Sequence, residues 1–464
     1  MRQYVKLAFI LASSAFLSAC SSFSAGNLFS HYSAQNEAVY QAVKSGHYQE
    51  ADALLPEYVA GDILDNLEKG RVQLLNEQFQ QSQASLARGD SAVRELQDKA
   101  VISVSESAAS ISSFAVNDNL SVYQPADYEL GFLHLYLGLN YIQQNSLEDA
   151  LVEMRRANIV QERARKERER ELESAQEQLE NQGLSPNLGS ILSQYPDAGD
   201  TLKAVQNGYL LYLSALLYEA SGELNSAYVD YRRALAVAPD NTQVIEGTKR
   251  VAKRLGMSSD LKQLERRYGK AKTLASNESR VIVLEEQGIV EAMQAWKQSL
   301  PLFDSRGLGA LYSISLPYYP TAQTQSFLPM TLDQSQLSSD LLTDVNLMAQ
   351  KNLSERMPAI IIRQAIRVWA KDQLRRQTTE QNGVGNLLFN VWNVMTEQAD
   401  TRSWLTLPGE IRSSSEVVTA GDHVIEVADK RIQFHVDEGD TVLVWVSRQG
   451  NSATIWHKQL GNIR

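Results

Sequence analysis

The side chains best suited to chemistry are sparse in this 464-residue chain. It has one cysteine, Cys20, and six histidines, at positions 31, 47, 134, 423, 435 and 457. Metal ligands recur at short, characteristic spacings, and these histidines show none. His423, His435 and His457 fall on predicted C-terminal strands and could converge in space, although solvent-facing strand positions explain them more simply. The sequence therefore predicts no metal site.

Motifs of catalysis and cofactor binding are also missing. The chain has no His-Glu-x-x-His, no Gly-x-Ser-x-Gly, no cysteine pair and no glycine-rich phosphate loop. The stretch Gly383-Val384-Gly385 begins like a dinucleotide motif but lacks the third glycine and a preceding strand, so we expect a turn at the start of a helix. We accordingly expect no catalytic residue, no cofactor and no enzymatic activity.

The first nineteen residues have the composition of an export signal. Arg2 and Lys6 precede an apolar run of about ten residues at 7–16, which is too short to span a bilayer. The following Leu17-Ser18-Ala19-Cys20 matches the bacterial lipobox, and this resemblance implies cleavage before Cys20 and acylation of that residue. An ordinary secretory signal with an incidental cysteine is the alternative. The absence of any other cysteine favours export to an oxidising compartment.

The resemblance to sorted lipoproteins also predicts where the protein resides. Ser21 and Ser22 follow the cysteine where an inner-membrane retention signal usually has Asp, so we expect the periplasmic face of the outer membrane. Several acyl chains on one residue give a stable anchor, and 20–33 reads as a flexible, lipidated tether. Without Arg2 and Lys6, 42 basic residues face 55 acidic ones, a net charge of −13, which argues against nucleic acid as a ligand.

Internal repeats organise the first half of the mature chain. A thirty-four-residue pattern resembling the tetratricopeptide repeat is clearest at Leu211, Ala215, Tyr218, Gly222, Ala227, Tyr231, Ala234 and Pro239. A second copy has Leu137, Gly138, Tyr141, Asn145, Ala150, Met154 and Ala157. A weaker copy has Ala42, Gly46, Tyr48, Ala51 and Leu55, and a degenerate hairpin is expected at 64–89. The small residues let paired helices approach, and most of these positions serve packing.

These repeats predict a helical solenoid over 34–275, whose concave groove would bind a protein or peptide. It is interrupted at 161–206 by a charged insertion, in which opposite charges at helical spacing over 161–182 indicate a long exposed helix. Glycines and prolines then indicate a loop before the next helix, near Leu202. The insertion is either a solvated spacer or a partner contact.

Strand-like patterns replace the helical period after about residue 280. The runs 281–284 and 311–316 read as strands, the second stopped by Pro317 and Pro320, and helices are expected at 341–377 and 387–398. We expect a mixed α/β domain at 276–409. Short strands at 417–418, 424–427, 432–436, 442–446 and 453–456 then predict a small antiparallel sandwich at 410–464, packed on the preceding domain.

The segment 396–409 joins these two predicted domains. Asp400 and Arg402 are suited to a charge-assisted pair near Trp404, and we expect this cluster to hold the domains together rather than bind a ligand.

Taken together, the lipobox, the repeat around 152–158, the segment 316–320 and the string 399–404 resemble an uncharacterised family of tetratricopeptide-repeat-containing bacterial outer-membrane lipoproteins. The resemblance covers most of the mature chain and supplies no activity. It implies a setting beside other small outer-membrane lipoproteins, including activators of peptidoglycan synthases.

Three functions remain open at this level. The leading hypothesis is a tethered scaffold that captures a protein or peptide partner during cell-envelope assembly. The alternative is a module in the C-terminal half that binds or modifies peptidoglycan, with Trp404 or Trp445 as a platform for sugar rings. The third is a structural envelope lipoprotein without a dedicated partner.

Overall fold

The computed structural model describes residues 31–56, 59–103, 121–186, 202–272, 274–275, 277–303, 309–323, 325–378 and 398–463. The signal peptide, Cys20, most of the tether, residues 187–201 of the predicted insertion, Gly383-Val384-Gly385 and all but the last residue of the helix predicted at 387–398 lie outside these ranges. Within them, a helical first half precedes a strand-rich C-terminal region, as the sequence predicts. No helix in these ranges combines the length and apolar character needed to cross a bilayer.

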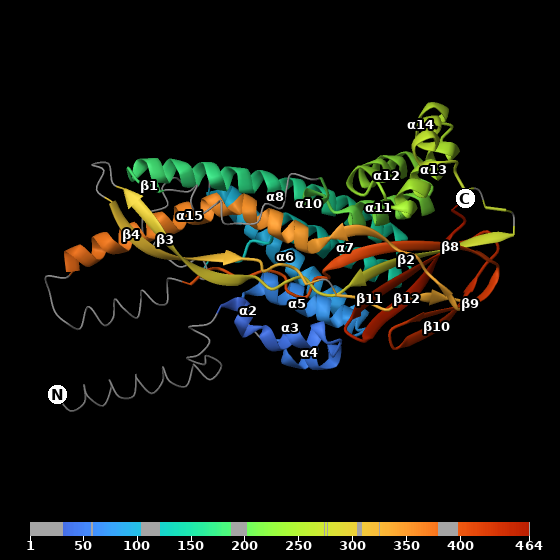
Figure 1. Ribbon diagram of the computed structural model, residues 1–464, viewed down its shortest axis with the longest axis horizontal. Helices are drawn as coiled ribbons and strands as arrows, with labels where there is room; N and C mark the ends of the chain where they lie inside the picture. The colour runs from blue at the N-terminus through green and yellow to red at the C-terminus, as the bar shows by residue number, and fades with distance from the viewer. Residues whose placement is uncertain are drawn as a thin grey trace.

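Pairs of antiparallel helices make up the first half (Figure 1). A short α2 (Tyr32–Gln35) leads into the pairs α3 (Glu37–Lys44) and α4 (Tyr48–Leu54), α5 (Asp62–Leu75) and α6 (Phe79–Ser103), α7 (Asp127–Gln143) and α8 (Leu147–Asn181), α11 (Gly208–Ala220) and α12 (Leu224–Val237), and α13 (Thr242–Arg254) and α14 (Ser258–Tyr268), with a short α10 (Leu202–Val205) before α11. The predicted tether ends too late, because Tyr32 and Ser33 are already buried in the fold.

The repeat residues lie at the turns and seams of these pairs. Gly222 has a φ of +83° in the α11–α12 turn, a conformation that glycine adopts without strain. At Gly138, a Cβ atom would lie 2.5 Å from Cε of Met154, so a larger residue here would require the flexible Met154 side chain to move. Pro239 follows the end of α12. Asn145 is exposed in the α7–α8 turn, with a φ of +63°. The other repeat positions in these two pairs are buried or partly buried: Leu137, Tyr141, Ala150, Ala157, Leu211, Ala215, Tyr218, Ala227, Tyr231 and Ala234.

A five-stranded sheet lies against the helices. Its order is β12 (Ser452–Gly461), β11 (Thr441–Gln449), β2 (Glu278–Gln287), β8 (Glu410–Thr419), β7 (Asp340–Asp344). The central strand β2 pairs in parallel with β11 and antiparallel with β8. The expected separation of a mixed domain at 276–409 from an antiparallel one at 410–464 is therefore wrong, because both regions contribute strands to one mixed sheet.

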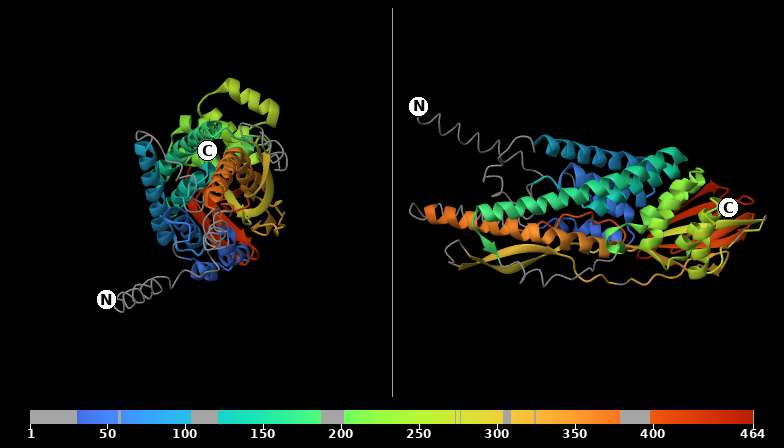
Figure 2. Two further views of the ribbon diagram at one scale, coloured as in Figure 1. Left: turned by 90° about the vertical axis from the view of Figure 1, so that its left-hand side faces the viewer. Right: turned by 90° about the horizontal axis from the view of Figure 1, so that it is seen from above.

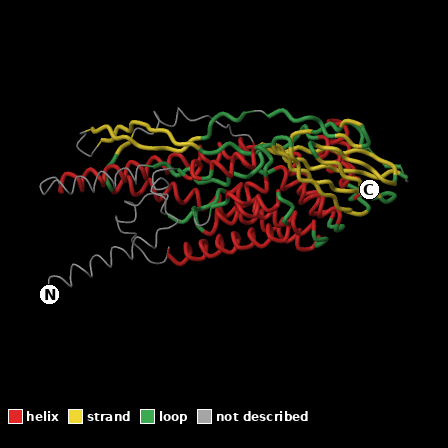
Figure 3. Tube along the Cα trace, turned by 90° about the horizontal axis from the view of Figure 1, so that it is seen from below, coloured by secondary structure: helices red, strands yellow, loops and turns green. Residues whose placement is uncertain are grey.

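A second, four-stranded sheet covers the other face of the first. It has the order β10 (Lys430–Val436), β9 (Gly421–Val427), β5 (Thr331–Leu332), β6 (Ser335–Gln336). Val281 and Val283 of β2 point into the core between the sheets, together with Phe434. Ile282 and Leu284, on the opposite face of β2, join the helical core. The molecule thus has a helical layer and two sheet layers. Figure 3 shows the strands of these sheets gathered at the C-terminal end, beside the helices.

An elongated arm extends away from the sheets (Figure 2). It combines the second half of α8, the helix α15 (Val345–Thr378), and a small sheet of β1 (Ser185–Pro186), β3 (Gln294–Phe303) and β4 (Gly309–Tyr318). Strand β4 continues through Pro317 to Tyr318, because an edge strand tolerates proline. The predicted helix at 341–377 begins only at Val345, since 341–344 belong to β7. The charged half of α8 is not fully exposed, because Ala175 packs against Ile362 of α15.

Candidate functional site

The inner face of the helical pairs is covered by the chain's own C-terminal half. Every residue from 128 to 140 in α7 and from 208 to 219 in α11 is buried. Tyr209 accepts a hydrogen bond of 3.0 Å from the indole N–H of Trp445 on β11, and Tyr136 packs edge-on against Trp404 at 5.8 Å between ring centroids. The groove expected to receive a partner is therefore filled, along these helices, by the sheet and by the segment before β8.

A buried ion pair stabilises the interface between the helices and the five-stranded sheet. Arg71 of α5 and Glu286 of β2 are both fully buried, with 2.6 Å between the guanidinium and the carboxylate. Arg71 also donates to the hydroxyl of Ser447 at 2.9 Å and to the carbonyl of Thr406 at 3.2 Å. Four parts of the sequence, more than 370 residues apart at the extremes, thus meet at the Arg71 side chain.

The segment 398–409 passes between helices and sheet and is held by two buried carboxylates. Glu129 accepts the backbone N–H of Trp404 at 2.7 Å, and Glu68 accepts that of Leu405 at 2.6 Å and the Thr406 hydroxyl at 2.6 Å. Burial raises the pKa of Glu68 and the hydrogen bonds lower it. Burial is the larger effect, and the resulting pKa is about 7. Burial likewise raises the pKa of Glu129.

The structure brings Asp400 and Arg402 together. The guanidinium donates two hydrogen bonds to the carboxylate, at 2.9 and 2.7 Å, and a third to the carbonyl of Ser121 at 2.9 Å. It also lies over the ring of Tyr123. Trp404 is completely buried, and its indole N–H donates to Thr406. These contacts connect the segment to residues just before α7.

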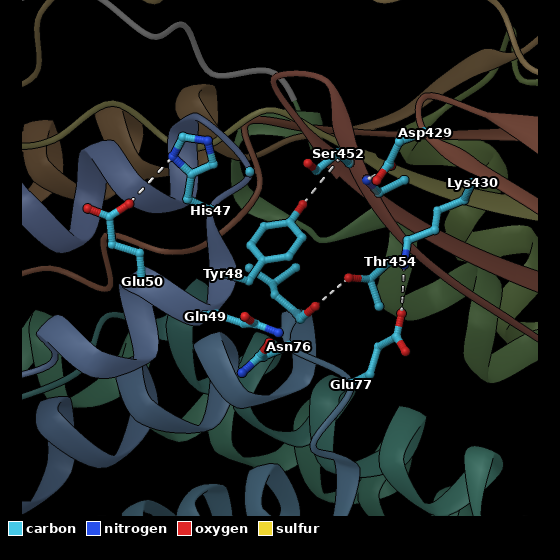
Figure 4. Close-up of a pocket in the computed structure, with 13 residues that line it drawn as sticks. His47, Tyr48, Gln49, Glu50, Asn76, Glu77, Asp429, Lys430, Ser452 and Thr454 are labelled. Carbon is cyan, nitrogen blue, oxygen red and sulfur yellow. Dashed lines mark hydrogen bonds and ion pairs between the residues drawn. The ribbon is translucent and has the colours of Figure 1, made fainter.

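An open, polar cleft that the sequence did not predict lies between the first helical pair and the sheets. Its volume is about 590 Å³, and four distant segments line it: 46–50 at the α3–α4 turn, 75–77 after α5, 429–430 between β9 and β10, and 452–454 on β12 (Figure 4).

Close backbone contact forms the floor of this cleft. Gly46 has a φ of +78°, and a Cβ atom there would lie 2.6 Å from Cβ of Ser452. The hydroxyl of Tyr48 donates to Gln449 at 2.5 Å, and that of Thr454 donates to the carbonyl of Leu75. The first helical pair is therefore docked onto the β11–β12 turn.

Charged side chains of both signs form the rim. Lys430 lies 3.4 Å from Glu77, and His47 lies 3.6 Å from Glu50, with all four side chains at least 39% exposed. Asp429 accepts the backbone N–H of Ala453 at 3.0 Å. Such a rim offers donors, acceptors and both charges to a polar ligand. Gly46 and Tyr48 belong to the weakest repeat copy, and this was the only sequence signal of the cleft.

The histidines do not form one cluster, although the rings of His423 and His457 both lie beside that of Phe434. His134 is buried 2.6 Å from Glu153, and His435 is exposed 2.8 Å from Asp422. His423 is buried rather than solvent-facing, 2.6 Å from Asp333, because β5 and β9 pair beside it. His457 packs against Phe434 with the two rings tilted by 33°. Across the described residues, no group of three or more potential ligands is arranged to hold a metal ion.

Comparisons with known proteins give little on this chain. No protein-family model matches the sequence, and no curated protein is similar to it at a significant level. Among solved structures, the TPR2AB-domain:pHSP90-complex of yeast Sti1 matches with 9% identity and a TM-score of 0.20, covering 50% of this chain and 87% of that chain. A superposition this poor carries no argument about fold or function.

Proposed function

We propose that this chain is a lipid-anchored protein of the outer membrane, facing the periplasm, that acts as a scaffold for a protein or peptide partner in cell-envelope assembly or maintenance. The observation that carries the proposal is the open cleft between the first helical pair and the sheets, where four segments present hydrogen-bonding and charged groups to solvent. The lipobox and the tetratricopeptide-like spacing support the anchor and the scaffold, respectively.

The structure changes where the partner would bind. A solenoid with an empty groove would bind it on the inner helices, but Trp445 and Trp404 occupy that place here. The cleft remains accessible, because Gln49, Glu50 and Asp429 are exposed at its rim. We therefore assign partner binding to the cleft.

The structure argues against the two tryptophans on which the glycan-binding alternative depends. Trp404 and Trp445 have no exposed surface, so neither can stack on a sugar ring in the folded protein. Sedimentation of the mature chain with purified peptidoglycan sacculi checks this directly. We expect no co-sedimentation above that of a non-binding control protein.

Site-specific photocrosslinking in cells tests the scaffold proposal. A photoreactive residue at Gln49 or at Lys430, on opposite sides of the cleft, should crosslink to one and the same envelope protein. The same probe at Val229, which is 56% exposed on α12, is the matched control. Lys430→Glu should weaken the Gln49 crosslink without lowering protein abundance. Equal labelling from all three positions, or no adduct from the cleft, would refute a partner site there.

Anchoring through Cys20 has its own test. The Cys20→Ala variant should accumulate as unprocessed or soluble protein, because neither the acyl chains nor the lipoprotein cleavage would be available. Fractionation followed by immunoblotting measures this. A mature-size band of the variant in the outer-membrane fraction would contradict the lipid anchor.

A further inference from the structure

A second cavity, distinct from the cleft, lies between α13 and the five-stranded sheet, where Figure 1 places α13 beside β8 and β2. Its volume is about 360 Å³. Three cationic side chains line it: Arg250 of α13, Lys272, and Arg280 of β2. Two carboxylates, Glu246 and Glu278, line it as well.

Arg280 is the unusual member of this set. Arg280 is only 9% exposed, yet no carboxylate in the described part of the chain lies within ion-pair distance of its guanidinium. Its guanidinium makes one long hydrogen bond, 3.5 Å to the carbonyl of Ile463, although it carries five N–H donors. Burial, together with the positive charge of Arg250, lowers the pKa of Arg280 to about 10.

Most charged groups near Arg280 already pair with other side chains. Glu219, a buried carboxylate whose charge acts on Arg280, accepts two hydrogen bonds of 2.7 Å from Arg250 and one of 3.1 Å from Arg254. Glu246 pairs with Lys249 at 2.7 Å. The other buried charges of β2 have partners, because Glu286 pairs with Arg71 and Glu285 with Arg448. Arg280 therefore differs from the other buried charged residues of its strand, Glu285 and Glu286.

We propose that this cavity binds a carboxylate group presented by a peptide of the partner protein, with Arg280 as the anchoring residue and Lys272 at the exposed rim. A guanidinium binds a carboxylate through two parallel hydrogen bonds, and a dry site strengthens them. A singly charged carboxylate fits better than a phosphate dianion, because Glu246 and Glu278 line the same cavity and would repel the second charge. The source of the carboxylate rests on the proposed function, whereas the chemistry of the site does not.

The stability of the ligand-free protein provides one test. An uncompensated buried cation costs folding free energy, and a binding residue often carries such a cost. Arg280→Met keeps the length and apolar stem of the side chain, so the melting temperature of the variant should equal or exceed that of the wild type. A melting temperature several degrees lower would show that Arg280 stabilises the fold, and would overturn the proposal.

Ligand-induced stabilisation provides the second test. N-acetylglycine, a monocarboxylate, should raise the melting temperature of the mature chain saturably, whereas N-acetylglycinamide at matched ionic strength should not. Arg280→Met should abolish this shift, and Arg431→Met, which removes a 72% exposed cation on β10, should retain it. A shift that survives Arg280→Met, no shift in the wild type, or a larger Arg280-dependent shift with sulfate would each refute a carboxylate site. The melting-temperature test is independent of crosslinking. The carboxylate site can therefore fail while a cleft partner is found, and a cleft partner can be missing while the carboxylate site is confirmed.

Discussion

Removing one side of the buried pair between Arg71 and Glu286 should destabilise the whole protein. Breaking such a pair costs about 3–5 kcal/mol, because the remaining charge stays buried without compensation. Arg71→Met also loses the hydrogen bonds to Ser447 and Thr406, at about 1 kcal/mol each, partly offset by the apolar Met side chain. We therefore expect Arg71→Met to lower the free energy of unfolding by about 4–6 kcal/mol and Glu286→Gln by about 3 kcal/mol.

The double variant distinguishes this pairing from two independent effects. With both charges removed, the cost should fall short of the sum of the single costs by at least about 2 kcal/mol. Urea unfolding followed by far-ultraviolet circular dichroism and tryptophan fluorescence measures all three variants. Arg431→Met, at an exposed pair with Glu426, is the control and should cost less than about 0.5 kcal/mol. If the losses in free energy of unfolding of the two single variants add up to that of the double variant, the reasoning is refuted. It is also refuted if the fluorescence and dichroism transitions of the wild type separate, because helices and sheet are expected to unfold together.

Three further predictions concern other contacts. Gly46→Ala should destabilise the protein by more than about 2 kcal/mol, because its Cβ would clash with β12, whereas Gly61→Ala, with a φ of +90° but open space, should cost about 1 kcal/mol in the same urea assay. Because the folded-state pKa of Glu68 is raised to about 7, its contribution to stability is fully present below about pH 4 and is lost as the pH rises through 7. Wild type should therefore lose on the order of 3 kcal/mol more than Glu68→Gln between pH 5 and pH 8, and parallel pH profiles would contradict this. Arg402→Ala should lower the melting temperature by a few degrees, equivalent to about 1–2 kcal/mol, and an unchanged value in calorimetry would exclude a structural role for its contact with Asp400.

Local signals in the sequence predicted local structure well. The helical period and the glycine at 222 placed the α11–α12 pair, and the apolar runs at 281–284 and 442–446 fell within strands β2 and β11. These features depend on residues close in sequence, whose spacing reflects which face is buried. The broad order, helices first and strands last, was accordingly confirmed.

Pairing between distant segments was not predictable in the same way. Strands β2 and β11 are about 160 residues apart and join in parallel, and no local pattern specifies that partner. One signal was nevertheless present: Val281 to Leu284 is apolar at consecutive positions, which is typical of a strand covered on both faces. That run was consistent with a central strand, and the structure places it between β11 and β8.

The buried polar residues were the hardest to recognise. Nothing in the sequence marked Arg71 and Glu68 as buried, because their partners lie more than 200 residues away. The opposite error affected Trp404 and Trp445, whose large rings suggested a sugar platform although both are enclosed. Sequence shows which side chains are unusual, but burial depends on what the rest of the chain places over them.

The position of β2 has a consequence for the order in which the chain can fold. Synthesis proceeds from the N-terminus, so α3 to α14 are complete while β8, β11 and β12 are still missing. Until those last strands arrive, β2 has neither of its neighbours, and the apolar side of α7 and α11 faces solvent. A ribosome-released chain ending at residue 409 should therefore aggregate or be degraded. Such a protein benefits from a holding chaperone that stays bound until the final fifty residues have emerged.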